Sequence, residues 1–187
     1  YCVCHDVGVP NSTAQNNVDY YKRTANLEPI SAHTFTDDKK IIECIPLDEK
    51  AWHVRRIVGN DKQLYGVSAN DASIGVELCY FPSDIPRSKV AYKNYVEYIA
   101  LLCKRFTLKP TDDLVAHKTL DPVRRTDPFN AFRYISKSWE QFLQDVKEEM
   151  KLDELMPSCE KEKEEISKLK KWINDLLVYI QRLIIKR

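Results

Sequence analysis

The sequence has 187 residues, of which 29 are basic and 28 acidic, so its formal net charge at neutral pH is +1. This balance argues against a dedicated nucleic-acid-binding protein, which normally carries a basic excess. A chain of this length can bury a core without disulfide bonds. No apolar run approaches the roughly 18 residues of a membrane-spanning helix.

The cysteines and the start of the chain bear on the compartment in which the protein is made. The sequence begins at Tyr1 without an initiator methionine, so we expect a missing N-terminal piece, and a signal peptide is neither claimed nor excluded. No two of the six cysteines have the C-x-x-C spacing of a zinc finger. Because most lie among apolar residues, we expect reduced, structural thiols and synthesis in a reducing cytoplasm. The six are Cys2, Cys4, Cys44, Cys79, Cys103 and Cys159.

The beginning of the chain predicts a strand, a helix and a hairpin, in that order. Tyr1–His5 alternates between apolar and polar residues and predicts a short strand that ends at a histidine. After a turn, apolar residues at helical spacing predict a helix that starts at Asn11 or Ser12. Two β-rich runs, Ser31–Thr36 and Lys40–Pro46, are separated by a short polar stretch and predict a hairpin.

The middle of the chain predicts a loop, a central strand and the clearest helix. Residues 54–72 are polar and hold two of the four glycines, so we expect a loop there. Ser73–Phe81 is apolar and β-branched enough for a central strand. The helix that follows lies between Pro86 and Pro110. Its apolar face comprises Tyr92, Tyr95, Val96, Ile99, Leu102, Cys103 and Phe106.

Two further elements complete the expected globular part. Leu114–His117 predicts a second short strand that ends at a histidine, and Leu120–Pro128 predicts a loop. Ser138 and Gln141 have the spacing of a capping box and predict the start of another helix. Its apolar residues are Trp139, Phe142, Val146 and Met150. The alternation of strands and helices predicts an α/β domain over residues 1–150.

Beyond Pro157 the sequence changes character, and residues 151–187 predict a helical, coiled-coil-like tail. Charges of both signs interleave with six apolar residues at the a and d positions of a heptad repeat. We expect residues 158–187 to self-associate. A dimer and a higher-order bundle both remain open, as does folding back onto the preceding helix, because apolar residues at e and g widen the stripe. The a and d residues are Ile166, Leu169, Ile173, Leu176, Ile180 and Leu183, and the others are Trp172, Leu177, Tyr179 and Ile184.

Two of the four histidines close predicted strands, where a side chain is held at the lip of a sheet. These are His5 and His117, and Asp127 follows ten residues after His117 in the predicted loop. Two neutral imidazoles and one carboxylate suit a zinc ion that keeps its fourth position open for water. The spacing alone leaves open the alternative that these are unrelated surface or core histidines.

Five ordered segments connect this pattern with a known family. They are Val3-Cys4-His5, Ser31-Ala32-His33 with Asp37-Asp38, Ile45-Pro46-Leu47 with Ala51-Trp52-His53, Ser73-Ile74-Gly75-Val76-Glu77, and Ala116-His117-Lys118 with Asp121-Pro122 and Arg125-Thr126-Asp127-Pro128. Over roughly residues 1–145 the sequence resembles the type-2 N-acetylmuramoyl-L-alanine amidases, which include phage endolysins, bacillus autolysins and peptidoglycan-recognition proteins. The resemblance implies a mixed central sheet flanked by helices, with zinc in a surface groove.

The resemblance also implies roles for individual residues. The zinc ligands map onto His5, His117 and Asp127, and a carboxylate in the third position is a harder ligand than the cysteine of many relatives. Glu77 maps onto a catalytic glutamate that takes a proton from the attacking water and passes it to the leaving amine. The alternative is a strand glutamate on a solvated face. Arg125 stands where relatives often have lysine, and its cation suits an oxyanion although it cannot give up a proton; the alternative is an arginine paired with carboxylates.

Three more residues are expected to contact the substrate: His33, Trp52 and His53. In some relatives a catalytic tyrosine precedes the histidine that corresponds to His33, but here Ala32 does, so a tyrosine-dependent mechanism is not expected. His53, directly after Trp52, is expected to line the substrate groove or to support the site. The alternative for either histidine is a buried, hydrogen-bonded side chain.

The implied activity is zinc-dependent hydrolysis of the amide bond between N-acetylmuramic acid and L-alanine in bacterial peptidoglycan, with one zinc per chain. We expect a protein made in the cytoplasm that reaches the cell wall by holin release or by secretion. The competing function is a non-catalytic peptidoglycan-binding domain on the same fold. Such domains typically lose a metal ligand, whereas His5, His117, Asp127 and Glu77 are all present. A structural oligomer organised by the tail is a third possibility, but it leaves the ordered motifs unexplained.

Overall fold

The computed structural model describes residues 1–27, 29–56, 60–152 and 168–171. The chain divides into two units, Tyr1–Glu149 and Met150–Arg187, and the fold below is that of the first unit. Apart from residues 168–171, which are helical, the predicted heptad tail lies outside the described residues. Its self-association therefore stays a prediction. None of the described helices combines the length and the apolar composition that crossing a membrane requires.

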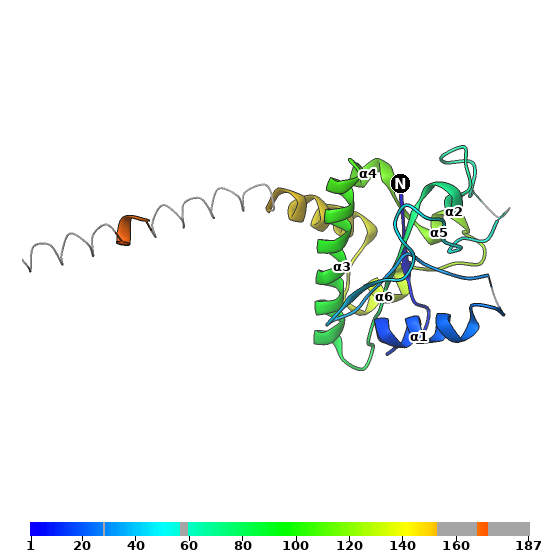
Figure 1. The fold of residues 1–187 in the computed structure, drawn as a ribbon, viewed down its shortest axis with the longest axis horizontal. Coiled ribbons are helices and arrows are strands. Elements are labelled where there is room, and N and C mark those ends of the chain that lie inside the picture. Colours follow the sequence, from blue (N-terminus) through cyan, green and yellow to red (C-terminus); the bar gives the residue numbers. More distant parts are fainter. Residues whose placement is uncertain (28, 57–59, 153–167, 172–187) are drawn as a thin grey trace, which may run out of the picture. The chain divides into compact units, whose positions relative to one another are not determined.

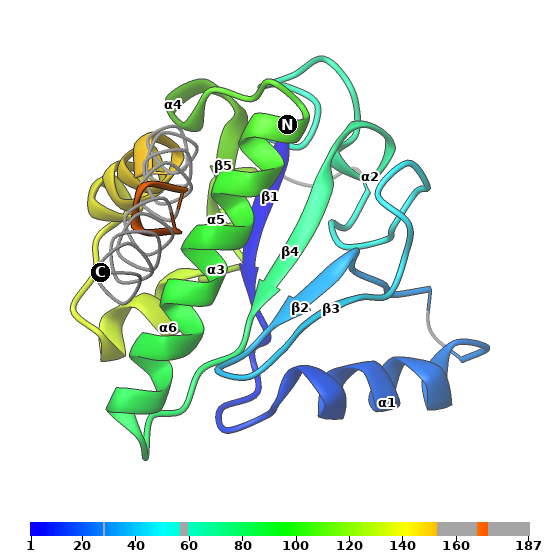
Figure 2. The ribbon, with the colours of Figure 1, turned by 60° about the vertical axis from the view of Figure 1, so that its left-hand side comes forward.

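A mixed five-stranded sheet forms the centre of the unit, as the sequence predicts (Figure 2). The strands lie in the order β3-β2-β4-β1-β5. β4 pairs in parallel with both β1 and β2, β1 pairs in parallel with β5, and only β3 is antiparallel to its neighbour β2. The strands are β1 (Cys2–Asp6), β2 (Thr34–Thr36), β3 (Ile41–Glu43), β4 (Ile74–Leu78) and β5 (Leu114–Ala116).

The two faces of the sheet carry different residues because side chains alternate along each strand. One face is covered by α3 (Ile85–Arg105), whose Tyr95 hydroxyl donates to the carbonyl of Val76 over 3.2 Å. The opposite face carries Val3 in an apolar cluster with Val115 of β5 and with Val54, Ala69 and Leu120. Figure 1 shows α3 on one side of the sheet, with α2 (Ala69–Ala72) and α5 (His117–Leu120) on the other. The second face is the one on which the site is built.

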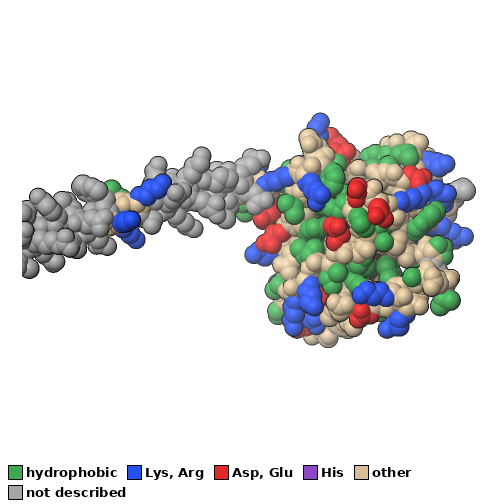
Figure 3. Space-filling model, viewed as in Figure 1, with side chains coloured by type: hydrophobic (Ala, Val, Ile, Leu, Met, Phe, Trp, Pro, Cys, Tyr) green, Lys and Arg blue, Asp and Glu red, His purple; other side chains and the backbone are tan. Residues whose placement is uncertain are grey.

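The remaining helices of this unit frame the sheet. α1 (Ala14–Thr24) contacts β2 and β3, and Tyr21 packs edge-on against Phe35 with ring centroids 5.1 Å apart. α4 (Pro110–Asp113) leads into β5, α6 (Phe129–Tyr134) follows the loop after α5, and a last helix begins at residue 139. The surface between them mixes acidic and basic side chains, as Figure 3 shows for one view, in keeping with the balanced net charge.

Both capping boxes of the unit are formed, and one moves a predicted boundary. The backbone N–H of Gln141 donates to Ser138 Oγ and that of Ser138 donates to Gln141 Oε1, as predicted. The first helix, however, begins at Ala14 behind a capping box between Thr13 and Asn16. The predicted start at Asn11 or Ser12 was wrong, because Asn11 has a φ of 62° and belongs to the preceding turn, and Thr13 is the N-cap residue.

Other predicted boundaries also shift. Pro86 lies in the first turn of α3 instead of before it, a position where the missing N–H costs nothing. His117 does not close a strand but opens α5. The expected loop of residues 54–72 contains α2, and α5 and α6 were not predicted at all. These helices span four to six residues, which is too short for a helical period to show in the sequence.

Candidate metal centre

The sheet register places the first two site residues side by side. His5 and Glu77 are paired residues of the parallel strands β1 and β4, so their side chains leave the same face of the sheet. His117 follows β5, the other neighbour of β1, and opens α5. Asp127 comes from the loop between α5 and α6. Parallel strands end at one edge of a sheet, and that edge gathers residues that are far apart in sequence.

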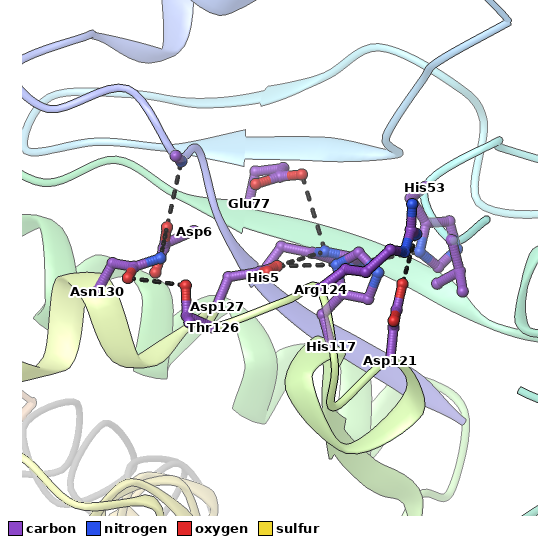
Figure 4. Close-up of polar contacts among 12 residues, drawn as sticks. His5, Asp6, His53, Glu77, His117, Asp121, Arg124, Thr126, Asp127 and Asn130 are labelled. Atoms are coloured by element: carbon purple, nitrogen blue, oxygen red, sulfur yellow. Dashed lines mark hydrogen bonds and ion pairs between the residues drawn. The ribbon is translucent and has the colours of Figure 1, made fainter. Parts of the chain in front are cut away.

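Asp127 links the two histidines, as Figure 4 shows. Its Oδ2 lies 3.0 Å from Nδ1 of His5 and 2.9 Å from Nδ1 of His117. All three side chains are buried, and one potential ligand atom from each lies within 4.8 Å of the others. The two imidazole rings meet edge-on with centroids 4.4 Å apart. The three residues that the sequence singled out as metal ligands are thus brought together.

The electrostatics of this cluster fit a cation. Burial, reinforced by the neighbouring His117, lowers the pKa of His5 to about 4, so His5 is a neutral imidazole at neutral pH. Burial works to raise the pKa of Asp127, but the adjacent side chains of His117 and His5 outweigh it and leave that pKa below its usual range. A neutral imidazole and an ionised carboxylate are the forms in which these groups bind a metal ion.

Glu77 lies at the edge of the cluster, with a carboxylate oxygen that can accept a proton. Its Oε1 lies 4.0 Å from Nδ1 of His5, and its side chain is 12% exposed. Its Oε2 is buried with no hydrogen-bond partner among the described residues. Burial raises the pKa of Glu77 well above its usual value, the charges of Asp127 and Asp6 add to this, and Arg125 opposes it. A carboxyl group with a raised pKa beside a cavity suits proton transfer at neutral pH.

A cavity of about 600 Å³ opens over the cluster. His5, Glu77, His117 and Asp127 line it, and so does the exposed Arg125. Asp6, which was not predicted to belong to the site, also lines the cavity and fixes the neighbouring segments in place. Its carboxylate accepts hydrogen bonds from the Asn130 side chain and from the backbone N–H groups of Gly8 and Ala131. The clue in the sequence was that Asp6, an acidic residue, directly follows His5 within a buried strand.

The three expected substrate-binding residues occupy different surroundings. Trp52 is 40% exposed, with Lys50 Nζ 4.5 Å and the Arg56 guanidinium carbon 5.0 Å from the indole centroid. It lines a neighbouring cavity of about 350 Å³ together with His53. His53 also lines the main cavity but is only 7% exposed, and its Nδ1 lies 2.9 Å from Nε2 of His5.

His33 is buried away from the cavity lining. Its Nδ1 accepts the backbone N–H of Gly75 over 2.9 Å, and its Nε2 donates to the carbonyl of Glu49 over 3.0 Å. Both ring nitrogens therefore tie β4 to the segment after the hairpin. A role of His33 in binding substrate stays a prediction.

A protein-family profile and two curated sequences that match this chain point to the same family. The profile of the Amidase_2 family, described as N-acetylmuramoyl-L-alanine amidase, matches residues 1–130. The N-acetylmuramoyl-L-alanine amidase BlyA of Bacillus subtilis is 33% identical over 124 residues, which cover 62% of this chain and 33% of BlyA. CwlA of the same organism is 36% identical over 94 residues, or 50% of this chain and 31% of CwlA. The chain thus spans about a third of the length of these curated relatives.

Solved structures show the same fold. The Staphylococcus aureus hydrolase AmiA, solved in complex with its ligand, superposes with a TM-score of 0.64 at 25% identity, over 80% of this chain and 71% of AmiA. PlyL superposes with a TM-score of 0.62 at 26% identity, over 78% of this chain and 82% of PlyL.

Proposed function

The chain belongs to the N-acetylmuramoyl-L-alanine amidase family, and from this premise we propose that it hydrolyses the amide bond between the lactyl group of N-acetylmuramic acid and L-alanine in bacterial peptidoglycan. The observation that carries the proposal is the meeting of His5, His117, Asp127 and Glu77 at one cavity. A peptidoglycan-binding domain without activity needs neither a complete set of metal ligands nor a carboxyl group with a raised pKa beside them.

We propose that one zinc ion per chain binds His5, His117 and Asp127. The donor set supports this: catalytic zinc is typically held by three nitrogen or oxygen ligands that leave a fourth position open. Burial and neighbouring groups keep His5 neutral and Asp127 ionised, the forms that bind metal. When bound, the ion supplies a more acidic water and polarises the substrate carbonyl.

Two residues of the chain, Glu77 and Arg125, act on the substrate beside the metal site. Glu77 accepts the proton of the attacking water and delivers it to the nitrogen of the leaving L-alanine, a transfer that its raised pKa assists. Arg125, at the rim of the same cavity, places a permanent cation near the oxygen that becomes negative during attack. It does not take part in proton transfer, because arginine stays protonated in proteins.

Trp52 is the proposed contact for the part of the substrate beyond the scissile bond. Its exposed ring borders the cavity next to the metal centre, and a large, rigid aromatic surface binds a ligand at little entropic cost. The proposed partner is therefore peptidoglycan, and the proposed place of action is the cell wall, reached by holin release or by secretion.

Metal analysis and product analysis test the proposal together. We expect one zinc per purified chain, loss of lysis on chelation and recovery with zinc. Purified peptidoglycan should release new amino groups of L-alanine; release of reducing sugars instead would refute the assigned bond. Glu77→Ala should keep the zinc and lose hydrolysis by about 10²–10⁴-fold. Glu43→Ala, on the exposed edge strand β3, is the matched control and should behave as wild type.

A further inference from the structure

The imidazole of His53 stands directly on the central strand. A Cβ atom added to Gly75 would lie 2.4 Å from Cγ, 2.6 Å from Nδ1 and 2.8 Å from Cδ2 of that ring. Gly75 pairs with Val3, two residues before His5, so it shares the face of the sheet on which His5 stands. A glycine inside a buried strand often marks such a close approach. The ring of His53 is thus seated beside His5.

The backbone of His53 is fixed by a buried asparagine. Asn70 Oδ1 accepts the N–H groups of His53 and Val54 over 3.0 and 2.8 Å, and its amide donates to the carbonyl of Val54 over 2.5 Å. Asn70 is 2% exposed, so these bonds have no competition from bulk water. Contacts within the protein therefore fix both the ring and the backbone of His53, and no hydrogen bond to a substrate in the cavity is needed.

A chain of hydrogen bonds runs from the metal centre through His53, and its last link, at Ser73, favours one direction for the whole chain. Nε2 of His5 lies 2.9 Å from Nδ1 of His53, and Nε2 of His53 lies 3.4 Å from Oγ of Ser73. The Ser73 hydroxyl donates to the carbonyl of Ala69 over 2.6 Å. A hydroxyl has one proton, so Ser73 can only accept from His53. A neutral imidazole has one N–H, so Nδ1 of His53 accepts and Nε2 of His5 donates.

This direction leaves Nδ1 of His5 without a proton. That atom faces Oδ2 of Asp127 at 3.0 Å, and two acceptors that face each other are stabilised by a shared cation. The bonds of the chain are all satisfied when His5 is a ligand through Nδ1. Metal-binding histidines commonly use their second ring nitrogen in this way, to fix the tautomer and the orientation of the ring.

We infer that His53 is a positioning residue that holds His5 in the tautomer able to bind the metal through Nδ1, with Ser73 setting the direction of the chain. The inference rests on the proposed zinc site. It assigns His53 a role through His5, which is the second of the two roles expected from the sequence, support of the site and not contact with the substrate.

Zinc affinity, measured on the full chain by competition with a chelator, tests the role. His53→Leu fills a similar volume without an acceptor and should weaken zinc binding by about 10–100-fold. His53→Asn places an oxygen where Nδ1 stands and should stay within a few-fold of wild type. Ser88→Ala is the control: Ser88 is also buried, but its hydroxyl bonds only to the backbone of Phe81, outside the lining of the cavity. It should lower the melting temperature and leave the zinc affinity of the folded protein unchanged.

The tautomers give a readout that needs no variant. Nitrogen NMR of the zinc-loaded wild type should show both His5 and His53 protonated at Nε2. A proton on Nδ1 of His53 would overturn the inference, as would zinc binding by His53→Leu at wild-type affinity or by His53→Asn no better than by His53→Leu. These results leave the proposed function standing. A wild-type chain that binds no zinc would instead refute the proposed function itself.

Discussion

The close contact between Gly75 and His53 makes Gly75→Ala a sharp perturbation. The added Cβ would lie 2.4 Å from the ring, whereas ordinary contact begins at 3.4 Å, so the ring must retreat by about 1 Å (3.4 − 2.4). The backbone of Gly75 is not in the left-handed region, so alanine meets no conformational strain there. On strand propensity alone the change should stabilise the protein by about 0.5–1 kcal/mol.

We expect the steric effect to prevail and to reverse that sign. Overpacking a well-filled site costs about 1–3 kcal/mol, which for a domain of this size lowers the melting temperature by roughly 2–4 °C per kcal/mol. The displaced ring also loses its alignment with Nε2 of His5, so zinc affinity should fall by about 10-fold or more. Thermal melting in chelator and in zinc, with chelator competition, measures both effects.

A double-mutant cycle isolates the contact. In a His53→Ala background the ring is gone, so Gly75→Ala should cost almost nothing or stabilise slightly, which gives a coupling of about 1–3 kcal/mol. The reasoning is wrong if Gly75→Ala retains the melting temperature and zinc affinity of wild type. It is also wrong if the loss is the same with and without the ring of His53, because glycine would then be needed for a different reason.

Three other changes probe the site, its support and the tail. Arg125→Ala removes a cation and should lower kcat by about 10²–10³-fold without weakening zinc binding. Arg125→Lys should retain most activity, and equal kcat for the two variants would contradict the oxyanion role. Asn70→Ala leaves three buried backbone groups of residues 53 and 54 without their partner and should destabilise the domain by at least about 1–3 kcal/mol in denaturant unfolding, an effect that Asn70→Asp should only partly reproduce. A chain that ends at Met156 should hydrolyse a soluble muropeptide as the full chain does but scatter light as a smaller species; an oligomer that survives truncation would place the interface in the globular unit.

The sequence predicted the parts of this fold that depend on local pattern. The strand Ser73–Phe81 and the hairpin of Ser31–Thr36 with Lys40–Pro46 follow from β-branched and alternating residues. Both are present over shorter ranges, as β4 and as β2 with β3. The capping box at Ser138 was also predictable, because both of its partners lie within one turn.

The missing parts depend on contacts between distant residues. His53 and His5 are 48 positions apart, and no spacing rule relates them. The direction of their hydrogen bond is set by Ser73, whose own partner is a backbone carbonyl that no sequence pattern marks. One clue was available, since a glycine in the middle of an apolar strand often signals that another group lies against it. His33 shows the reverse problem: its place in the hairpin motif gives no sign that both ring nitrogens bond to backbone.

The order of the strands has a consequence for when the site comes into being. β1 is the first strand of the chain, yet its two neighbours in the sheet are β4 and β5, and the contact between His5 and Asp127 spans 122 positions. Contacts of such long range form late, because the entropy of closing a long loop is lost before they can stabilise anything. The chain must therefore be synthesised at least through Asp127 before His5 can contact its partners. The proposed capacity to cut a cell wall would then belong only to the finished domain and to no growing fragment of it.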